Sequence, residues 1–277
     1  MPPLSPPIHR RCDMSRSRHH NKHHYRSLFL SDFHLGSRGC SPGPILDFLQ
    51  SVRADAIYLV GDILDLWHGG PVQWGDIHAE IIETLEAHAE AGTRIVYLPG
   101  NHDAALRSPG MNFLSFELAE TALHVGADGQ RYLIVHGDQC DARILRWHAM
   151  TRFGSRMDAL FRGIDAWLRR RRDVSETERT LIQLAIEGIN HLIARGSDEH
   201  RLIALASEAG VDGIICGHSH KPALREVGGM TYANCGDWVD SLTALAEDSS
   251  GALQLLQWGA EGFVKLTRLG LTPSGSG

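Results

Sequence analysis

Residues 27–34 read Ser-Leu-Phe-Leu-Ser-Asp-Phe-His, a short apolar run that ends on two candidate metal ligands, Asp32 and His34. Such a run is typical of a buried strand, and the two polar side chains directly follow it. Open α/β sheets bind ligands at the carboxyl ends of their strands. The stretch therefore predicts a sheet with a ligand site at that edge.

Four further blocks repeat this arrangement along the chain. Each follows an apolar run, at residues 57–60, 95–99, 132–135 and 214–216. A single block is weak evidence, because a lone Asp after a strand is most often a turn residue or a helix cap. All five in order predict one crevice lined by metal ligands. The further blocks are Gly61-Asp62-Ile63-Leu64-Asp65, Gly100-Asn101-His102-Asp103, His136-Gly137-Asp138 and Gly217-His218-Ser219-His220.

The side chains in these blocks form the set that a dinuclear site for phosphoester hydrolysis needs. Two cations about 3.5–4 Å apart activate a water molecule and offset the charge of the phosphate. Mixed Asp, Asn and His donors suit Mn²⁺, Fe²⁺ or Zn²⁺. The candidate metal ligands are Asp32, His34, Asp62, Asn101, His136, His218 and His220.

The Asp-x-His and His-x-His pairs are spaced for one side of an extended chain. Asp32 and His34 are two residues apart, and so are His218 and His220. An extended backbone turns both members of each pair in one direction, so each pair is expected to reach one metal pocket or two adjacent ones. Asp62, directly after its strand, is placed to bridge both ions.

The third block also offers candidate catalytic residues. His102 follows Asn101 directly and is expected to point toward the substrate, where it can donate a proton to the leaving oxygen. Asp103 is expected to orient that imidazole through a hydrogen bond.

Composition is that of an ordinary globular protein. The 277 residues are 43% hydrophobic and 22% charged, with a net charge of −6, which allows a sizeable core. No run of about 18 apolar residues is present, and the N-terminus lacks the apolar segment of a secretory signal. Five scattered cysteines with no Cys-x-x-Cys pair favour reduced thiols in the cytoplasm.

Alternating apolar runs and amphipathic segments predict an α/β fold. Strands are expected at 27–31, 56–60 and 94–98, with helices near 44–53 and 76–91 between them, which is typical of a parallel sheet. Later strands have no helices between them and are expected to be antiparallel. Together the elements predict a mixed two-sheet β-sandwich flanked by helices. The later strands are expected at 212–216, 230–235, 241–246, 252–258 and 262–267.

One domain is expected over residues 26–268, between a disordered tail at 1–25 and a flexible end at 269–277. Residues 142–209 look helical throughout and are predicted to form a helical cap insertion. Nine Arg and three Asp lie within 141–172, so the insertion can face an anionic substrate or a membrane surface. The alternative is two helices that pack only on each other. Candidate substrate-binding residues are Arg143, Arg146, Trp147, Arg152 and Lys221.

The five blocks resemble those of the calcineurin-like metallophosphoesterase superfamily, whose pattern is D-x-H, GD-x-x-D, GNH-D, H-GD and GH-x-H. The resemblance runs from Leu28 to about Glu247. It implies a metallophosphoesterase-type mixed β-sandwich, with His102 as the catalytic acid. It further implies that Asp32, His34, Asp62 and His220 hold one ion, whereas Asp62, Asn101, His136 and His218 hold the other.

Finer details resemble the UDP-2,3-diacylglucosamine pyrophosphatase group. That group cleaves its substrate to UMP and lipid X in lipid A synthesis, at the cytoplasmic membrane face, with manganese as its usual metal. Its best-known members carry Arg where this chain has His102, so a sister branch with another substrate is an alternative. The matching segments are Ser31 to Gly36, Gly61 to Trp67, His136 to Asp141 and Asn234 to Ser241.

The resemblance thus implies a metal-dependent hydrolase with two divalent ions, Mn²⁺ first and Fe²⁺ or Zn²⁺ as alternatives. Its substrate is expected to be a phosphoester, acylated or not. We expect a cytoplasmic protein with peripheral contact to the anionic inner face of the cytoplasmic membrane. Neither a nucleic-acid substrate nor an obligate protein partner is expected. The alternatives are a phosphodiesterase or phosphatase for soluble nucleotides and a scaffold that has lost catalysis.

Overall fold

The computed structural model describes residues 23–66, 73–108, 110–140, 198–259 and 262–269. Most of the expected insertion at 142–209 lies outside these ranges, and its last part coincides with helix α6, Asp198–Glu208. The first strand begins at His23, so residues 23–25, expected in the tail, belong to a sheet. Within the described ranges, no helix has the length and apolar character needed to cross a membrane.

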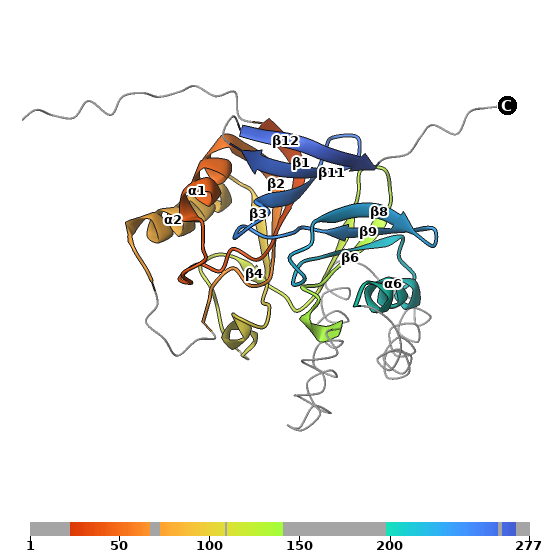
Figure 1. The fold of residues 1–277 in the computed structure, drawn as a ribbon, viewed down its shortest axis with the longest axis horizontal. Coiled ribbons are helices and arrows are strands. Elements are labelled where there is room, and N and C mark those ends of the chain that lie inside the picture. The colour runs from red at the N-terminus through yellow and green to blue at the C-terminus, as the bar shows by residue number, and fades with distance from the viewer. Residues whose placement is uncertain (1–22, 67–72, 109, 141–197, 260–261, 270–277) are drawn as a thin grey trace, which may run out of the picture.

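Three parallel strands form the centre of a seven-stranded sheet (Figure 1). They are β1 (His23–Leu30), β2 (Val52–Val60) and β3 (Arg94–Leu98), connected by α1 (Pro42–Ser51) and α2 (Asp76–Glu90). This confirms the predicted βαβ units. The sheet order is β12-β11-β10-β1-β2-β3-β4. The outer strands are β4 (Glu117–Leu118), β10 (Thr243–Glu247), β11 (Leu253–Gly259) and β12 (Gly262–Leu269).

A second sheet has five strands in the order β5-β6-β7-β9-β8. Its central strand β7 runs parallel to both β6 and β9, so the prediction that all late strands are antiparallel is wrong here. The reason is that β8 takes the sheet edge and a hairpin returns β9 between β8 and β7. The strands are β5 (Ala122–Val125), β6 (Arg131–Ile134), β7 (Gly213–Cys216), β8 (Ala223–Val227) and β9 (Met230–Asn234).

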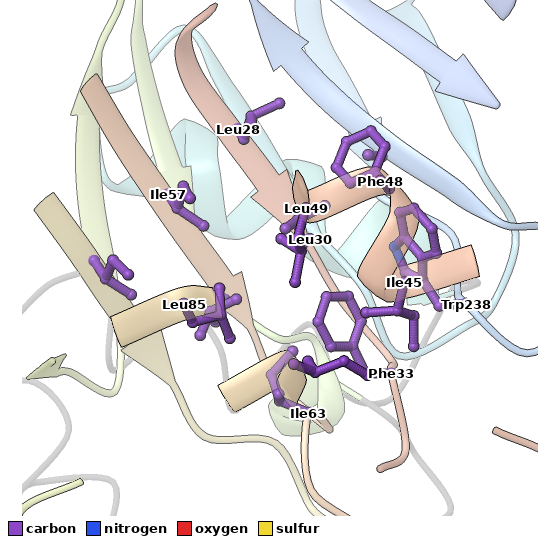
Figure 2. Close-up of a cluster of buried hydrophobic side chains, with 14 of the residues drawn as sticks. Leu28, Leu30, Phe33, Ile45, Phe48, Leu49, Ile57, Ile63, Leu85 and Trp238 are labelled. Carbon is purple, nitrogen blue, oxygen red and sulfur yellow. The ribbon is translucent and has the colours of Figure 1, made fainter. Parts of the chain in front are cut away.

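Alternating side chains on β1 build two cores. Leu28 and Leu30 are fully buried on the face covered by α1, where Ile45 and Phe48 meet them (Figure 2). Phe29 points the other way and packs in the core between the two sheets. Because each such burial contributes about 1.5–3 kcal/mol, a shift of one residue along the strand is strongly disfavoured.

Helix α6 covers the outer face of the five-stranded sheet. Its buried residues Leu202 and Ala206 pack with Leu133 and Ile214 of that sheet. The layers therefore run helix, sheet, sheet, helix, which confirms the predicted mixed sandwich flanked by helices. Two short 3-10 turns, η1 (Ala104–Arg107) and η2 (Asp138–Cys140), follow β3 and β6.

A buried carboxylate joins the two sheets. Glu247, at the end of β10, accepts hydrogen bonds from Arg26 Nη1 at 2.6 Å and from the Ala127 amide at 2.8 Å. Its other oxygen lies 2.8 Å from Nε2 of His124 in β5. Burial raises the pKa of Glu247, but the bonds from His124 and Ala127 outweigh this and hold the pKa below its ordinary 4.5.

Candidate metal centre

The ligand-bearing blocks meet at one edge because five strands end there. Asp32 follows β1 and donates its amide to the Gly61 carbonyl after β2, at 3.0 Å. Across the gap between the sheets, the His218 amide donates to Asp32 Oδ2 at 3.0 Å. Within the second sheet, the Gly217 amide donates to the His136 carbonyl at 2.9 Å. The candidate ligands of both sheets thus face one another, as their positions after strands predicted.

One group of ligand atoms gathers around Asp32. Its Oδ1 lies 3.1 Å from His220 Nε2 and 3.6 Å from His34 Nε2, and the two Nε2 atoms are 3.3 Å apart. A cation about 2.1 Å from each donor holds neighbouring donors at roughly these separations. Asp32 Oδ2 is fixed by Ser31 Oγ at 2.5 Å, so Oδ1 is the oxygen left to face a cation.

A second group consists of Asp62, His136 and His218, whose ligand atoms all lie within 4.8 Å of one another. His136 Nε2 is 3.3 Å from Asp62 Oδ2. On the other side of the ring, His136 Nδ1 lies 2.8 Å from the Val60 carbonyl. A carbonyl only accepts, so Nδ1 carries the proton and Nε2 presents its lone pair to the site.

Three buried atoms at this edge lack hydrogen-bond partners: Asp32 Oδ1, Asn101 Oδ1 and His136 Nε2. Buried polar atoms without partners are rare, because leaving one unpaired costs about 1–3 kcal/mol. All three belong to predicted ligands, and all three can donate a lone pair. The donor set therefore fits divalent cations, which would satisfy these atoms.

The backbone at the ligands is strained. Asp32, His34, Asp62, His218 and His220 have φ between 49° and 64°, the left-handed region that L-residues avoid. The expectation of extended Asp-x-His and His-x-His pairs is therefore wrong: each ligand sits on a sharp turn that directs its side chain inward. Among the described residues only two other non-glycine positions share this conformation, so the strain is concentrated at the site.

Two glycines leave room for the ligands. At Gly61, with φ of +79°, an added Cβ would overlap the His136 ring. At Gly100 it would overlap Asp62 Oδ1 and lie 2.7 Å from His136 Nε2. Both positions therefore require the absence of a side chain, which explains why glycine precedes Asp62 and Asn101.

The profile of the Calcineurin-like phosphoesterase family, Metallophos, matches residues 25–222, a span that includes both ligand groups. The chain belongs to the calcineurin-like phosphoesterase family. It is accordingly a hydrolase that acts on phosphoesters, and its family uses divalent metal ions.

Curated relatives of this phosphoesterase are named UDP-2,3-diacylglucosamine hydrolase. One from Xanthomonas campestris pv. campestris is 28% identical over 81% of this chain and 96% of its own length. One from Escherichia coli O7:K1 is 26% identical over 73% of this chain and 84% of its own.

Among solved structures, Vps29 from Entamoeba histolytica, complexed with Zn²⁺, has a TM-score of 0.44 and 16% identity, covering 88% of this chain and 97% of its own. Yfce, a phosphoesterase from E. coli, has a TM-score of 0.46 and 15% identity, with the same coverage of both chains.

His102, the predicted catalytic acid, is oriented by Asp65 and not by Asp103 as predicted. His102 Nδ1 lies 3.0 Å from Asp65 Oδ1. Asp103 instead accepts bonds from the Gly100 amide at 2.5 Å and the Tyr97 hydroxyl at 2.6 Å. Its oxygens also accept from amides of residues 62–64. The structure therefore gives Asp65 the orienting position expected for Asp103, which anchors the loop instead.

Ionisation at the site reflects the crowded charges. Burial raises the pKa of Asp32, but the imidazoles of His220 and His34 beside its carboxylate outweigh it and hold the pKa well below its ordinary range. Burial lowers the pKa of His136, but the carboxylates of Asp62 and Asp32 outweigh it and raise the pKa to about 10, so a cation that binds Nε2 takes the place of a proton there. The carboxylates therefore stay charged, which suits cation binding.

The predicted substrate-binding residues are placed only in part. Lys221 is exposed and directly follows His220. The other four, Arg143, Arg146, Trp147 and Arg152, lie outside the described residues. Ser31, which fixes Asp32 Oδ2, is a site residue that the sequence did not predict; its place between an apolar run and Asp32 was the only signal for it.

Proposed function

We propose that this enzyme is a dinuclear metal hydrolase that cleaves the pyrophosphate bond of a nucleotide-linked glycolipid such as UDP-2,3-diacylglucosamine, releasing UMP and lipid X. The observation that carries the dinuclear part is that, of the three groups of possible ligand atoms among the described residues, two share no residue: one around Asp32 and one around Asp62 and His136. The third group, His34, Asp65 and His102, shares His34 with the first and contains the proposed acid. Asp62 follows β2, the strand between β1 and β3, and we propose that its carboxylate serves both groups.

The five sequence blocks supply four proposed ligands for each ion. Bound ions supply positive charge that acidifies a water molecule and offsets the charge of the phosphate. Mn²⁺ is the metal we propose, with Fe²⁺ or Zn²⁺ as the other ions these donors suit. Asp32, His34, Asp62 and His220 would hold one ion, and Asp62, Asn101, His136 and His218 the other.

In this proposal His102 donates a proton to the leaving oxygen. The Asp65 carboxylate accepts from His102 Nδ1, which fixes the ring and directs Nε2 away from Asp65. The His102 ring packs edge-on against His34, with centroids 4.6 Å apart. His102 therefore lies beside the first group of ligands, where a phosphate held by the ions would be within reach of its proton.

The lipid substrate is supported by the names of the curated relatives, which match over most of this chain at 26–28% identity. The nine Arg residues within 141–172 add positive charge suited to an anionic glycolipid. We propose that Arg143, Arg146, Trp147, Arg152 and Lys221 contribute to substrate binding. The helical insertion at 142–209 would then serve as a cap, and the enzyme would act at the inner face of the cytoplasmic membrane.

A substrate panel with the Mn²⁺-loaded protein tests this proposal. We expect UMP release from UDP-2,3-diacylglucosamine, with slower UMP release from UDP-glucosamine, which lacks acyl chains, and slower p-nitrophenol release from bis(p-nitrophenyl) phosphate. The metal-free protein and the Asp62→Ala variant are controls that should be inactive on all three. Rapid turnover of the soluble esters with no UMP from the lipid would reject the lipid assignment.

A second candidate function is a phosphodiesterase or phosphatase for soluble nucleotides. It is favoured by His102, which is the residue of the general superfamily pattern in the third block, whereas the best-known members of the lipid-specific group carry Arg there. This function predicts that deleting the insertion leaves activity on small nucleotides intact. The lipid hydrolase would lose its preference for the acylated substrate on the same deletion.

A further inference from the structure

The Arg107 guanidinium joins the two loops that carry Asn101 and His136. Its Nε and Nη2 donate to the Pro99 carbonyl oxygen at 3.2 and 2.6 Å. Nη2 also donates to the two carboxylate oxygens of Asp138, at 3.2 and 3.0 Å. Pro99 comes two residues before Asn101, and Asp138 two residues after His136. One side chain thus spans the approaches to both ligands.

The two joined loops belong to different sheets. Asn101 follows β3 of the seven-stranded sheet, and His136 follows β6 of the five-stranded sheet. The turns η1 and η2, olive and bright green in Figure 1, lie at the same end of the molecule. The Asp138 side chain is only 4% exposed, so this charged bond is screened little by water. A planar guanidinium holds such a geometry more rigidly than an ammonium group.

Arg107 is poorly placed to bind substrate itself. Besides Asp138, its Nε lies 3.3 Å from a carboxylate oxygen of Glu120. Two carboxylates therefore offset its positive charge, and its Nε and Nη2 donors are bonded to protein oxygens. The side chain has a structural task at the site instead of a phosphate-binding one.

We propose that Arg107 is a positioning residue for the second ion, the one expected at Asp62, Asn101, His136 and His218. By fixing the Pro99 carbonyl relative to the Asp138 carboxylate, it sets the separation between Asn101 Oδ1 and His136 Nε2. Neither of these two atoms has a hydrogen-bond partner, so their separation depends on the loops that carry them. This inference rests on the proposed dinuclear site.

The test is Mn²⁺ binding to Arg107→Met, measured by titration calorimetry and by metal content after dialysis. We expect the wild-type enzyme to bind two ions, and the variant to keep one while its affinity for the other falls about 10–100-fold. Arg107→Lys should restore part of that affinity. Arg94→Met is the matched control, because Arg94 forms a similar pair with Glu117 at 2.7 Å but lies at the amino end of β3. It should bind both ions as the wild type does.

Several results would overturn the inference. A folded Arg107→Met protein that binds both ions with wild-type affinity, or that weakens both equally, contradicts it. Asp138→Asn provides a second route if Arg107→Met does not fold, and unchanged affinity for both ions in that variant also contradicts the inference. Wild-type protein that binds fewer than two ions would reject the dinuclear site and this inference together. Two ions in the wild type without UMP release from the lipid would reject only the proposed substrate.

Discussion

Replacing Gly100 with alanine should disable the centre without unfolding the protein. The new Cβ would lie 2.2 Å from Asp62 Oδ1 and 2.7 Å from Cδ2 and Nε2 of His136, whereas ordinary contact begins at 3.4 Å. The Asp62 oxygen must therefore move by about 1.2 Å and the His136 ring by about 0.7 Å. Metal ligands tolerate deviations of only about 0.2 Å. Displacements approaching 1 Å at a catalytic site cost about 10²-fold. We therefore expect kcat/KM to fall about 10²-fold and Mn²⁺ affinity to fall about 10–100-fold.

The assay compares Gly100→Ala with Gly43→Ala by calorimetric Mn²⁺ titration and by hydrolysis of bis(p-nitrophenyl) phosphate. An added Cβ at Gly43 has nothing within 4 Å, so this control should keep wild-type metal binding and rate. Circular dichroism establishes that both variants are folded. Wild-type affinity and rate in Gly100→Ala would refute the view that the His136 and Asp62 side chains must occupy this space.

Three further variants test other parts of the account. Asp65→Asn should lower kcat about 10–100-fold while metal content stays unchanged, and an unaltered kcat would contradict its role beside His102. His102→Ala should likewise retain metal, but slow turnover about 10²–10⁴-fold; metal loss instead would show that His102 is a ligand. Glu247→Gln should cost about 3 kcal/mol of unfolding free energy at pH 7 in urea, because His124 and Arg26 lose their charged partner. The folded pKa of Glu247 is below 4.5, so the extra stability of the wild type over Glu247→Gln is present above pH 4.5 and shrinks as the pH falls below it. A difference in unfolding free energy that stays constant down to pH 3 would contradict the charged role of Glu247.

The residues at the strand ends were the strongest indication in the sequence of where the site lies. Apolar runs before Asp32, Asp62 and His136 predicted that these residues share one edge, because parallel strands bring their carboxyl ends together. The structure places them so, with Asp62 Oδ2 and His136 Nε2 3.3 Å apart although 74 positions separate them in the sequence.

Local geometry at those strand ends could not be predicted in the same way. Spacing suggested an extended chain at Asp32 and His34, whereas both residues adopt positive φ. That conformation is unfavourable in isolation and persists only because surrounding contacts enforce it. The direction of each turn then decides whether Asp65 or Asp103 faces His102. The sequence did not indicate the role of Arg107, because its partner Asp138 is 31 residues away.

The most direct test of the central claim is a crystal structure of the Mn²⁺-loaded enzyme with anomalous data collected at the manganese edge. We predict two anomalous peaks about 3.5–4 Å apart, one beside Asp32, His34 and His220 and the other beside Asn101, His136 and His218, with Asp62 between them. A single peak, or none, with these side chains in the positions described, would contradict the dinuclear centre.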